Sequence, residues 1–320
     1  MNAVLTRTAR RSLWLALLLP LLMLMLQEHT SSAAAANVAV LMSANVEAYQ
    51  EALKGFKAAV DHRVVAEYEM AGNPDAGRKA LAEIRAKVKP DLILVVGTFA
   101  LQLAIEAPFD VPVIYTMVLN PPSVIGEEKR NMTGASMNVP VRSTMDLAKK
   151  LGPQIRRVGV VFNQAKTGYL IKQAEAAARE EGLQLVAKEI GSSREAIGAL
   201  SALQETGIDA LWIPPDETIL APEVVQQILL VSYDSKLPVI GLSLNQAQLG
   251  AIVSQQFSSG EDIGKQAAEL ANAVLKGHAA SELPYTSVRQ VSVIVNLKAA
   301  EKLGVPVPQS ILGIASNVIQ

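Results

Sequence analysis

Mainly polar side chains follow several apolar segments of the chain, at the points where strands are expected to end. Those in the first half are Ser43, Asn45, Thr98, Phe99, Thr116 and Met117, and those in the second half are Asn163, Gln164, Thr167, Asp216, Thr218 and Ser243. Most carry hydroxyl, amide or carboxylate groups, which hydrogen-bond small polar molecules. Ligands bind outside the carboxyl ends of parallel strands. If two sheets face each other, we therefore expect these residues to line one ligand cleft.

Thr98 and Asp216 are the leading candidates for ligand contact. The run Leu92–Val96 is apolar and unbroken, which predicts a strand covered on both faces. Gly97-Thr98 follows, so we expect Thr98 to cap a helix whose free N–H groups bind a carboxylate. Asp216 would pair with an ammonium group, and the ligand would then resemble an amino acid. The alternative is that these residues only cap helices and form turns.

The sequence lacks the motifs of the common enzyme classes. It contains no HExxH zinc motif, no phosphate-binding GxxxxGK[ST] loop and no dinucleotide-binding GxGxxG after its first strands. It has three histidines and no cysteine, so no thiol nucleophile, zinc–thiolate site or disulfide is possible. We expect no cofactor, no metal and no catalytic residue, and an exported α/β enzyme is the least favoured alternative.

Composition excludes other classes of partner. The chain has 320 residues, of which 50% are hydrophobic, and a formal net charge of −1. No long run of Lys and Arg occurs, so nucleic acid is not an expected partner.

The first 36 residues have the pattern of a secretory signal peptide. Arg7, Arg10 and Arg11 form a basic segment, Leu13–Leu26 is apolar, and small residues end at Ala36. The apolar segment is shorter than the roughly 20 residues that span a bilayer. The alternative to a cleaved signal peptide is a retained membrane anchor. No cysteine is available for a lipid anchor. We predict a cleaved signal peptide over residues 1–36 and a soluble periplasmic protein.

Strand and helix patterns alternate twice along the chain. Strands are predicted at 37–42, 63–68, 92–96, 111–116 and 132–137 and again at 157–163, 183–188, 208–213, 238–241 and 250–254. Asn37, Asp91 and Pro112 in the first half correspond to Arg157, Asp209 and Pro238 in the second half. This repetition predicts an α/β fold with two lobes built on parallel sheets.

The last elements exceed what the second half needs. A long helix is predicted at 258–276 and a strand at 287–296, and we expect them to return to the first lobe and then to the second. The predicted N-terminal lobe comprises residues 37–138 and 255–284. The predicted C-terminal lobe comprises 139–254 and 285–320.

Several segments resemble the substrate-binding components of bacterial ABC transporters with the type I periplasmic-binding fold, in the tryptophan/tyrosine-type group. These segments are PVIYTMVLNP (112–121), NMTGAS (131–136), IPPDETI (213–219), LPVIG (237–241) and VNLKAAEKLGVPVPQSIL (295–312). The resemblance implies two Rossmann-like lobes, a three-strand hinge and a cleft that closes on an amino acid. Thr98, Asn163 and Asp216 match positions that line the cleft of the family. Asn120-Pro121 and Gln255-Gln256 depart from its pattern near the cleft.

The resemblance also implies partners and a biological role. The expected function is that of a monomeric periplasmic binding protein that delivers a small ligand to an ABC permease in the inner membrane. The alternative is a periplasmic sensor that signals to a membrane receptor or a histidine kinase.

Overall fold

In the part of the chain that the structure describes, residues 35–126 and 130–320 of a computed structural model, the strands form two sheets. The five-stranded sheet is parallel and has the order β2 (Arg63–Glu69), β1 (Asn37–Met42), β3 (Leu92–Val96), β4 (Val113–Val118) and β5 (Met132–Ser136). The seven-stranded sheet has the order β12 (Ala315–Ile319), β11 (Val291–Asn296), β10 (Val253–Phe257), β9 (Val239–Gly241), β8 (Ala210–Trp212), β6 (Arg157–Phe162) and β7 (Gln184–Glu189). In it, β11 runs antiparallel to β10 and parallel to β12.

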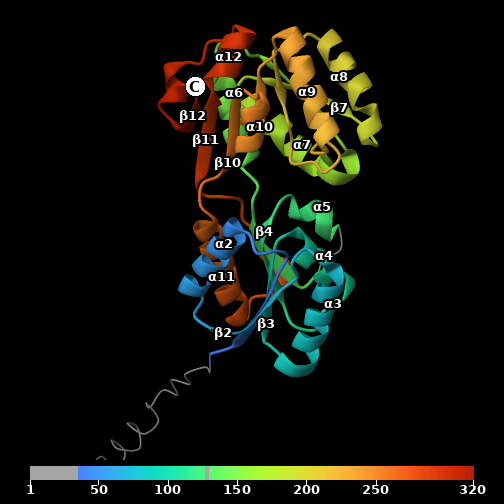
Figure 1. Ribbon diagram of the computed structural model, residues 1–320, viewed down its shortest axis with the longest axis vertical. Helices are drawn as coiled ribbons and strands as arrows, with labels where there is room; N and C mark the ends of the chain where they lie inside the picture. The colour runs from blue at the N-terminus through green and yellow to red at the C-terminus, as the bar shows by residue number, and fades with distance from the viewer. Residues whose placement is uncertain (1–34, 127–129) are drawn as a thin grey trace, which may run out of the picture. The chain divides into compact units, whose positions relative to one another are not determined.

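Helices cover both faces of each sheet (Figure 1). On the five-stranded sheet, α2 (Glu47–Ala59) and α11 (Gly260–Leu275) cover one face, and α3 (Pro74–Glu83), α4 (Thr98–Glu106) and α5 (Pro121–Ile125) cover the other. On the seven-stranded sheet, α6 (Val141–Lys150), α7 (Gln164–Glu180), α12 (Leu297–Leu303) and α13 (Gln309–Leu312) cover one face, and α8 (Ala196–Glu205) and α9 (Pro222–Ser235) cover the other. The remaining elements are α10 (Leu244–Leu249) and the short helices η1 (Ile84–Val88), η2 (Ser193–Glu195) and η3 (Ala280–Glu282).

The two halves repeat one topology, which confirms the predicted fold class. The order β2-β1-β3-β4-β5 recurs as β7-β6-β8-β9-β10. Asp91 Oδ2 accepts a hydrogen bond from the Asn37 amide (2.7 Å), and Asp209 Oδ2 accepts one from the Arg157 amide (2.8 Å). The two aspartates therefore join the starts of equivalent strands, which explains why the sequence places an acidic residue before each apolar run.

Helix α11 packs against α2, about two hundred residues earlier in the chain, because both helices carry glycine at the contact. A Cβ atom on Gly264 would lie 1.9 Å from the Ala52 carbonyl oxygen, and one on Gly55 would lie 2.0 Å from that of Glu261. Glycine at both positions lets the helix backbones approach closely. The chain after β10 is thereby fixed to the five-stranded sheet.

Within residues 130–320 the chain passes between the two sheets three times. The crossover segments are 137–140, 258–259 and 287–290. They are hydrogen-bonded to one another, since the Ser258 amide donates to Gln290 O (3.0 Å) and the Val288 amide donates to Asn138 O (3.1 Å). The predicted lobe boundary at residue 255 falls inside β10, because Gln255, Gln256 and Phe257 pair with β11 in the seven-stranded sheet.

Some element bounds differ from the prediction. Strand β4 lies two residues later than expected, and β10 begins at Val253 instead of Gly250. The reason for the second shift is α10, which ends at Leu249 and is capped by Gly250 with a φ of 133°. The predicted signal peptide, apart from Ala35 and Ala36, lies outside the described residues. No helix among the described residues has both the length and the apolar character that a membrane span requires.

Candidate functional site

A cavity of about 230 Å³ lies where the crossovers meet the carboxyl ends of β8, β9 and β10. We call it the hinge cavity. Its lining residues are Leu119, Met137, Asn138, Val139, Val141, Thr144, Leu170, Trp212, Pro215, Leu220, Leu242, Ser243, Gln246, Gln255, Gln256 and Phe257. Leu119 follows β4 of the five-stranded sheet, so elements of both sheets contribute. An apolar lining with a few polar groups is typical of small-molecule sites.

A larger groove, of about 880 Å³, lies at the opposite edge of the seven-stranded sheet. Gly250, which precedes β10, and Asn296, which ends the antiparallel β11, both line it. It therefore lies at the amino ends of the parallel strands. Ligands of open α/β sheets bind at the carboxyl ends, so the hinge cavity is the better candidate site.

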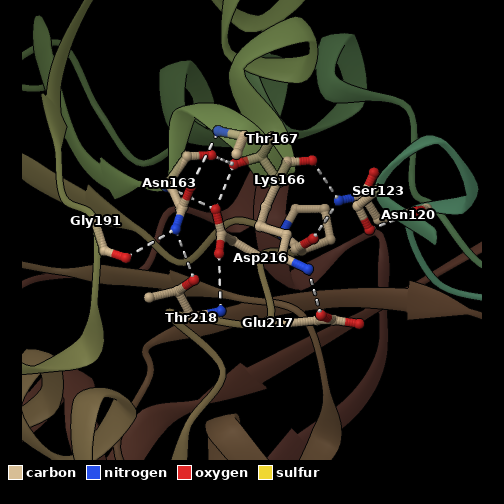
Figure 2. A network of polar contacts seen from close by, with 11 residues as sticks. Asn120, Ser123, Asn163, Lys166, Thr167, Gly191, Asp216, Glu217 and Thr218 are labelled. Atoms are coloured by element: carbon tan, nitrogen blue, oxygen red, sulfur yellow. Dashed lines mark hydrogen bonds and ion pairs between the residues drawn. The ribbon is translucent and has the colours of Figure 1, made fainter. Parts of the chain in front are cut away.

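Asn120 connects the two sheets beside this cavity. Its Nδ2 donates to the carbonyl oxygens of Lys166 and Pro215, both at 3.1 Å, and its Oδ1 accepts from the Tyr169 hydroxyl at 2.5 Å. Figure 2 shows Asn120 reaching towards Lys166. Asn120 has a φ of 50°, a left-handed conformation that asparagine tolerates better than most residues. Its own amide donates to Asn138 Oδ1 (2.8 Å), which fixes the loop after β4 to the first crossover.

Asp216 is fully buried, and its carboxylate accepts hydrogen bonds from other residues of the protein (Figure 2). Its Oδ2 accepts from the Asn163 amide (2.8 Å) and the Thr167 hydroxyl (2.5 Å), and its Oδ1 accepts from the Thr218 amide (2.9 Å). The carboxylate thus joins the start of α7 to the loop after β8. These bonds give Asp216 a structural role, and its predicted contact with a ligand ammonium stays a prediction.

Of the other predicted residues of the second half, Asn163, Thr167 and Thr218 lie around the same carboxylate. Asn163 caps α7 by accepting a hydrogen bond from the Ala165 amide (3.0 Å), and its Nδ2 donates to Thr218 Oγ1 (3.2 Å). Gln164 is exposed in the first turn of α7. Ser243 lines the hinge cavity and caps α10, because its Oγ accepts from the Gln246 amide (3.2 Å).

In the first half, the cap of α4 differs from the prediction. Gly97, with a φ of 89°, is the capping residue, and Thr98 is the first residue of the helix. The hydroxyl that accepts from the first turn belongs to Ser43, whose Oγ binds the Ala100 amide (2.9 Å). Ser43 can take the place of Thr98 as the cap because Gly97 has no Cβ atom and leaves room for the Ser43 side chain. A Cβ on residue 97 would lie 2.7 Å from Ser43 Oγ.

The remaining predicted residues of the first half differ in exposure. Phe99 is 60% exposed, whereas Thr116 and Met117 are buried in the core. Asn45 is exposed, and its Oδ1 accepts from the Gln50 side chain (3.0 Å). Among the predicted residues, Ser243 lines the hinge cavity, and Asn163, Thr167 and Thr218 gather around Asp216.

Most residues that line the hinge cavity were missed as site residues. Asn138, Thr144 and Gln246 carry no signal of their own in the sequence. The departure at Gln255-Gln256 was the available signal, since both glutamines line the cavity.

Burial controls the ionisation of the tyrosines near the crossovers. It raises the pKa of the Tyr115 and Tyr169 hydroxyls well above the usual value of 10.0, and nearby Tyr285 adds to both effects. These phenols are therefore neutral at physiological pH and serve as hydrogen-bonding groups. The described residues contain no group of three or more His, Cys, Asp or Glu side chains arranged to hold a metal ion.

Two lobes of parallel sheet, joined by three crossovers around a cavity, define the type I periplasmic-binding fold. The sequence model of the ABC transporter substrate binding protein family matches residues 37–319. The chain therefore belongs to this family, as its motifs predicted.

Known proteins of similar sequence and structure agree with this assignment. A tyrosine-binding protein of Clostridioides difficile (strain R20291) is 25% identical over 281 residues, which are 83% of this chain and 80% of that protein. An L-Trp complex of an ABC domain from Streptococcus pneumonia has a TM-score of 0.60 at 22% identity, over 88% of this chain and 100% of that one. A ligand-free, open substrate binding protein with adhesive properties from Clostridium difficile has a TM-score of 0.65 at 22% identity, over 89% of this chain and 99% of that one.

Proposed function

We propose that this protein is the periplasmic binding component of an ABC importer and that it holds an aromatic amino acid between its lobes. The observation that carries the proposal is the hinge cavity, which is lined by crossover segments and by the carboxyl ends of three strands. A ligand placed there contacts both lobes. Such contacts are required if binding is to shift an open–closed equilibrium.

The size and lining of the cavity favour an aromatic side chain as its occupant. A volume of about 230 Å³ corresponds to roughly seven or eight water molecules at about 30 Å³ each. Aliphatic side chains, Trp212 and Phe257 supply apolar contact area. The tyrosine-binding relative and the L-Trp complex support the same ligand class.

The amino acid backbone of the ligand would lie towards the exits of β3 and β4. There Thr98 and Phe99 begin α4, and Leu119 of the same lobe lines the cavity. Backbone N–H groups at a helix start favour a carboxylate. Thr98 is therefore the proposed contact for the ligand carboxylate.

Closure would occur by rotation about the crossover segments 137–140, 258–259 and 287–290. Hinges are short segments between rigid elements that absorb the dihedral changes of domain closure. The mutual hydrogen bonds of these segments support their movement as one unit. The proposed lobes are residues 37–138 with 258–286, and 139–257 with 287–320. The proposal also includes a cleaved signal peptide over 1–36, a monomeric state, an absence of turnover and an ABC permease as partner.

Isothermal titration calorimetry of the full chain against the twenty amino acids tests the ligand class. We expect saturable binding of at least one aromatic amino acid. Leu242→Trp places a large side chain at the cavity and should weaken that binding at least tenfold. Leu230→Trp is the matched control, because Leu230 lines the larger groove at the opposite edge of the seven-stranded sheet. Absence of binding by every amino acid, or equal effects of the two substitutions, would refute the proposed site.

A further inference from the structure

Three large apolar side chains are exposed together in the larger groove, the one of about 880 Å³ at the amino ends of the parallel strands of the seven-stranded sheet. Leu230 and Tyr233 of α9 are 49% and 59% exposed, and Leu249 of α10 is 60% exposed. Single exposed apolar residues are ordinary, whereas a shared apolar patch with a polar rim marks an interaction site. The groove is therefore a candidate for a second binding site.

The charged residues that line this groove are two lysines of α12, Lys298 and Lys302. They are four residues apart, so they are neighbours on the helix surface. Six other lysines of the described chain, among them Lys54 and Lys265, form salt bridges, but these two do not. No described acidic residue lines the groove. The groove therefore presents positive charge without a counter-charge beside exposed apolar side chains.

The position of Lys298 is not explained by helix α12 itself. The helix begins at Leu297, so Lys298 lies in its first turn, where the helix dipole disfavours a positive charge. Lys302 lies in the last turn, where the dipole favours one. Lys298 is exposed and its side chain has no hydrogen-bond partner among the described residues. Its ammonium group is therefore free to bind an anion in the groove.

The dimensions of the groove fit an elongated small molecule. Pro222 and Tyr233 both line it, so it follows eleven residues of α9, or about 16 Å of helix. Small-molecule sites have volumes of about 300–1,000 Å³, and this groove falls within that range. An elongated hollow with apolar walls and two lysines matches a molecule that has an anionic head and an alkyl tail.

We propose that the larger groove is a second ligand site, which binds a free single-chain carboxylate with an alkyl tail. The tail contacts Leu230, Tyr233 and Leu249, and the carboxylate forms charge-assisted hydrogen bonds with Lys298 and Lys302. The groove lies at the opposite edge of the sheet from the hinge cavity, and the two share no lining residue. This site is therefore independent of the proposed amino acid site.

The test compares dodecanoate with dodecyltrimethylammonium, which has the same tail and the opposite charge, by calorimetry on the full chain below the micelle concentration of each. We expect saturable binding of dodecanoate, at least tenfold tighter than that of the cation, and weaker at high salt. Lys298→Gln and Lys302→Gln should each weaken dodecanoate binding severalfold. Lys172→Gln is the matched control, because Lys172 is an exposed lysine of α7 without an ion pair and lies outside the groove; it should leave the affinity unchanged.

Leu249→Ser separates the contribution of the tail from that of the head, because it should weaken the binding of both amphiphiles. Equal affinities for the two amphiphiles, no saturable binding of dodecanoate, or equal effects of Lys172→Gln and the two groove variants would overturn the proposal. Cosedimentation with phosphatidylglycerol vesicles in the absence of dodecanoate binding would also overturn it and would assign the groove to a membrane surface. The experiment uses no amino acid, so its failure leaves the proposed function untouched.

Discussion

Replacing Asn120 removes the side-chain hydrogen bonds that connect the loop after β4 to the second half of the chain. Asn120 is 2% exposed, and its amide group bonds Lys166 O, Pro215 O and the Tyr169 hydroxyl. A neutral hydrogen bond contributes about 1 kcal/mol net, so Asn120→Gly should lower the free energy of unfolding by about 3 kcal/mol. Asn120→Ala should cost about 1 kcal/mol more, since the φ of 50° is unfavourable for alanine.

Urea denaturation followed by circular dichroism measures this loss. Asn45→Gly is the matched control, because Asn45 is exposed and bonds Gln50 at the protein surface, and a change within about 0.5 kcal/mol is expected there. Asn120→Asp should also destabilise, since a carboxylate oxygen would face the two carbonyl oxygens that Nδ2 now binds. An Asn120→Gly protein as stable as the Asn45→Gly control would show that the hydrogen bonds of Asn120 do not stabilise the fold.

Three further predictions concern single side chains. Gly97→Ala should destabilise by about 2–3 kcal/mol in the same assay, because φ is 89° and the new Cβ would meet Ser43 and Tyr49; a neutral effect would contradict this. Asp216→Asn should lower the free energy of unfolding by about 2 kcal/mol or more, because an NH₂ group would replace an oxygen that accepts from buried donors. The exposed control Glu217→Gln should be nearly neutral. If the two variants are equally stable and Asp216→Asn loses ligand affinity, Asp216 is instead a ligand contact. Burial raises the pKa of Tyr115, so above pH 10 the unfolded chain loses this proton before the folded chain does. The free energy of unfolding should therefore fall as pH rises, by up to about 1.4 kcal/mol per pH unit. Tyr115→Phe should reduce the slope of unfolding free energy against pH between pH 9 and 11, and an unchanged slope would show that Tyr115 does not cause it.

The architecture could be predicted because it depends on local patterns. Unbroken apolar runs such as Leu92–Val96 have the length of buried strands, and Asp91 and Asp209 mark equivalent strand starts. These patterns repeat at similar spacing, so the duplication was visible without coordinates. The return of α11 to the first sheet was also expected from the surplus of elements after 254.

The site could be predicted only in part, because its residues come together through tertiary structure. Leu119, Trp212 and Gln255 are separated by more than forty residues along the chain and meet only at the crossovers. The bonds of Asn120 depend on a left-handed backbone that Asn120-Pro121 does not specify by itself. The donors that surround Asp216 belong to Asn163, Thr167 and Thr218, and its position in the sequence does not reveal them.

The role of Thr98 illustrates the same limit. The sequence identified the turn at Gly97-Thr98 but assigned the cap to the nearer hydroxyl. The actual acceptor, Ser43, lies more than fifty residues away, at the end of β1. Neighbouring parallel strands bring their exit loops together, so a cap of this kind follows from strand order and not from local sequence.

An aromatic amino acid bound between the proposed lobes should draw them together. Small-angle X-ray scattering of the full chain, with and without saturating L-tyrosine or the tightest ligand found by calorimetry, tests both parts in one measurement. We expect a lower radius of gyration in the bound state, and we expect Leu242→Trp to reach that state only at higher ligand concentration. Saturated binding with an unchanged scattering curve would contradict closure about the three crossovers.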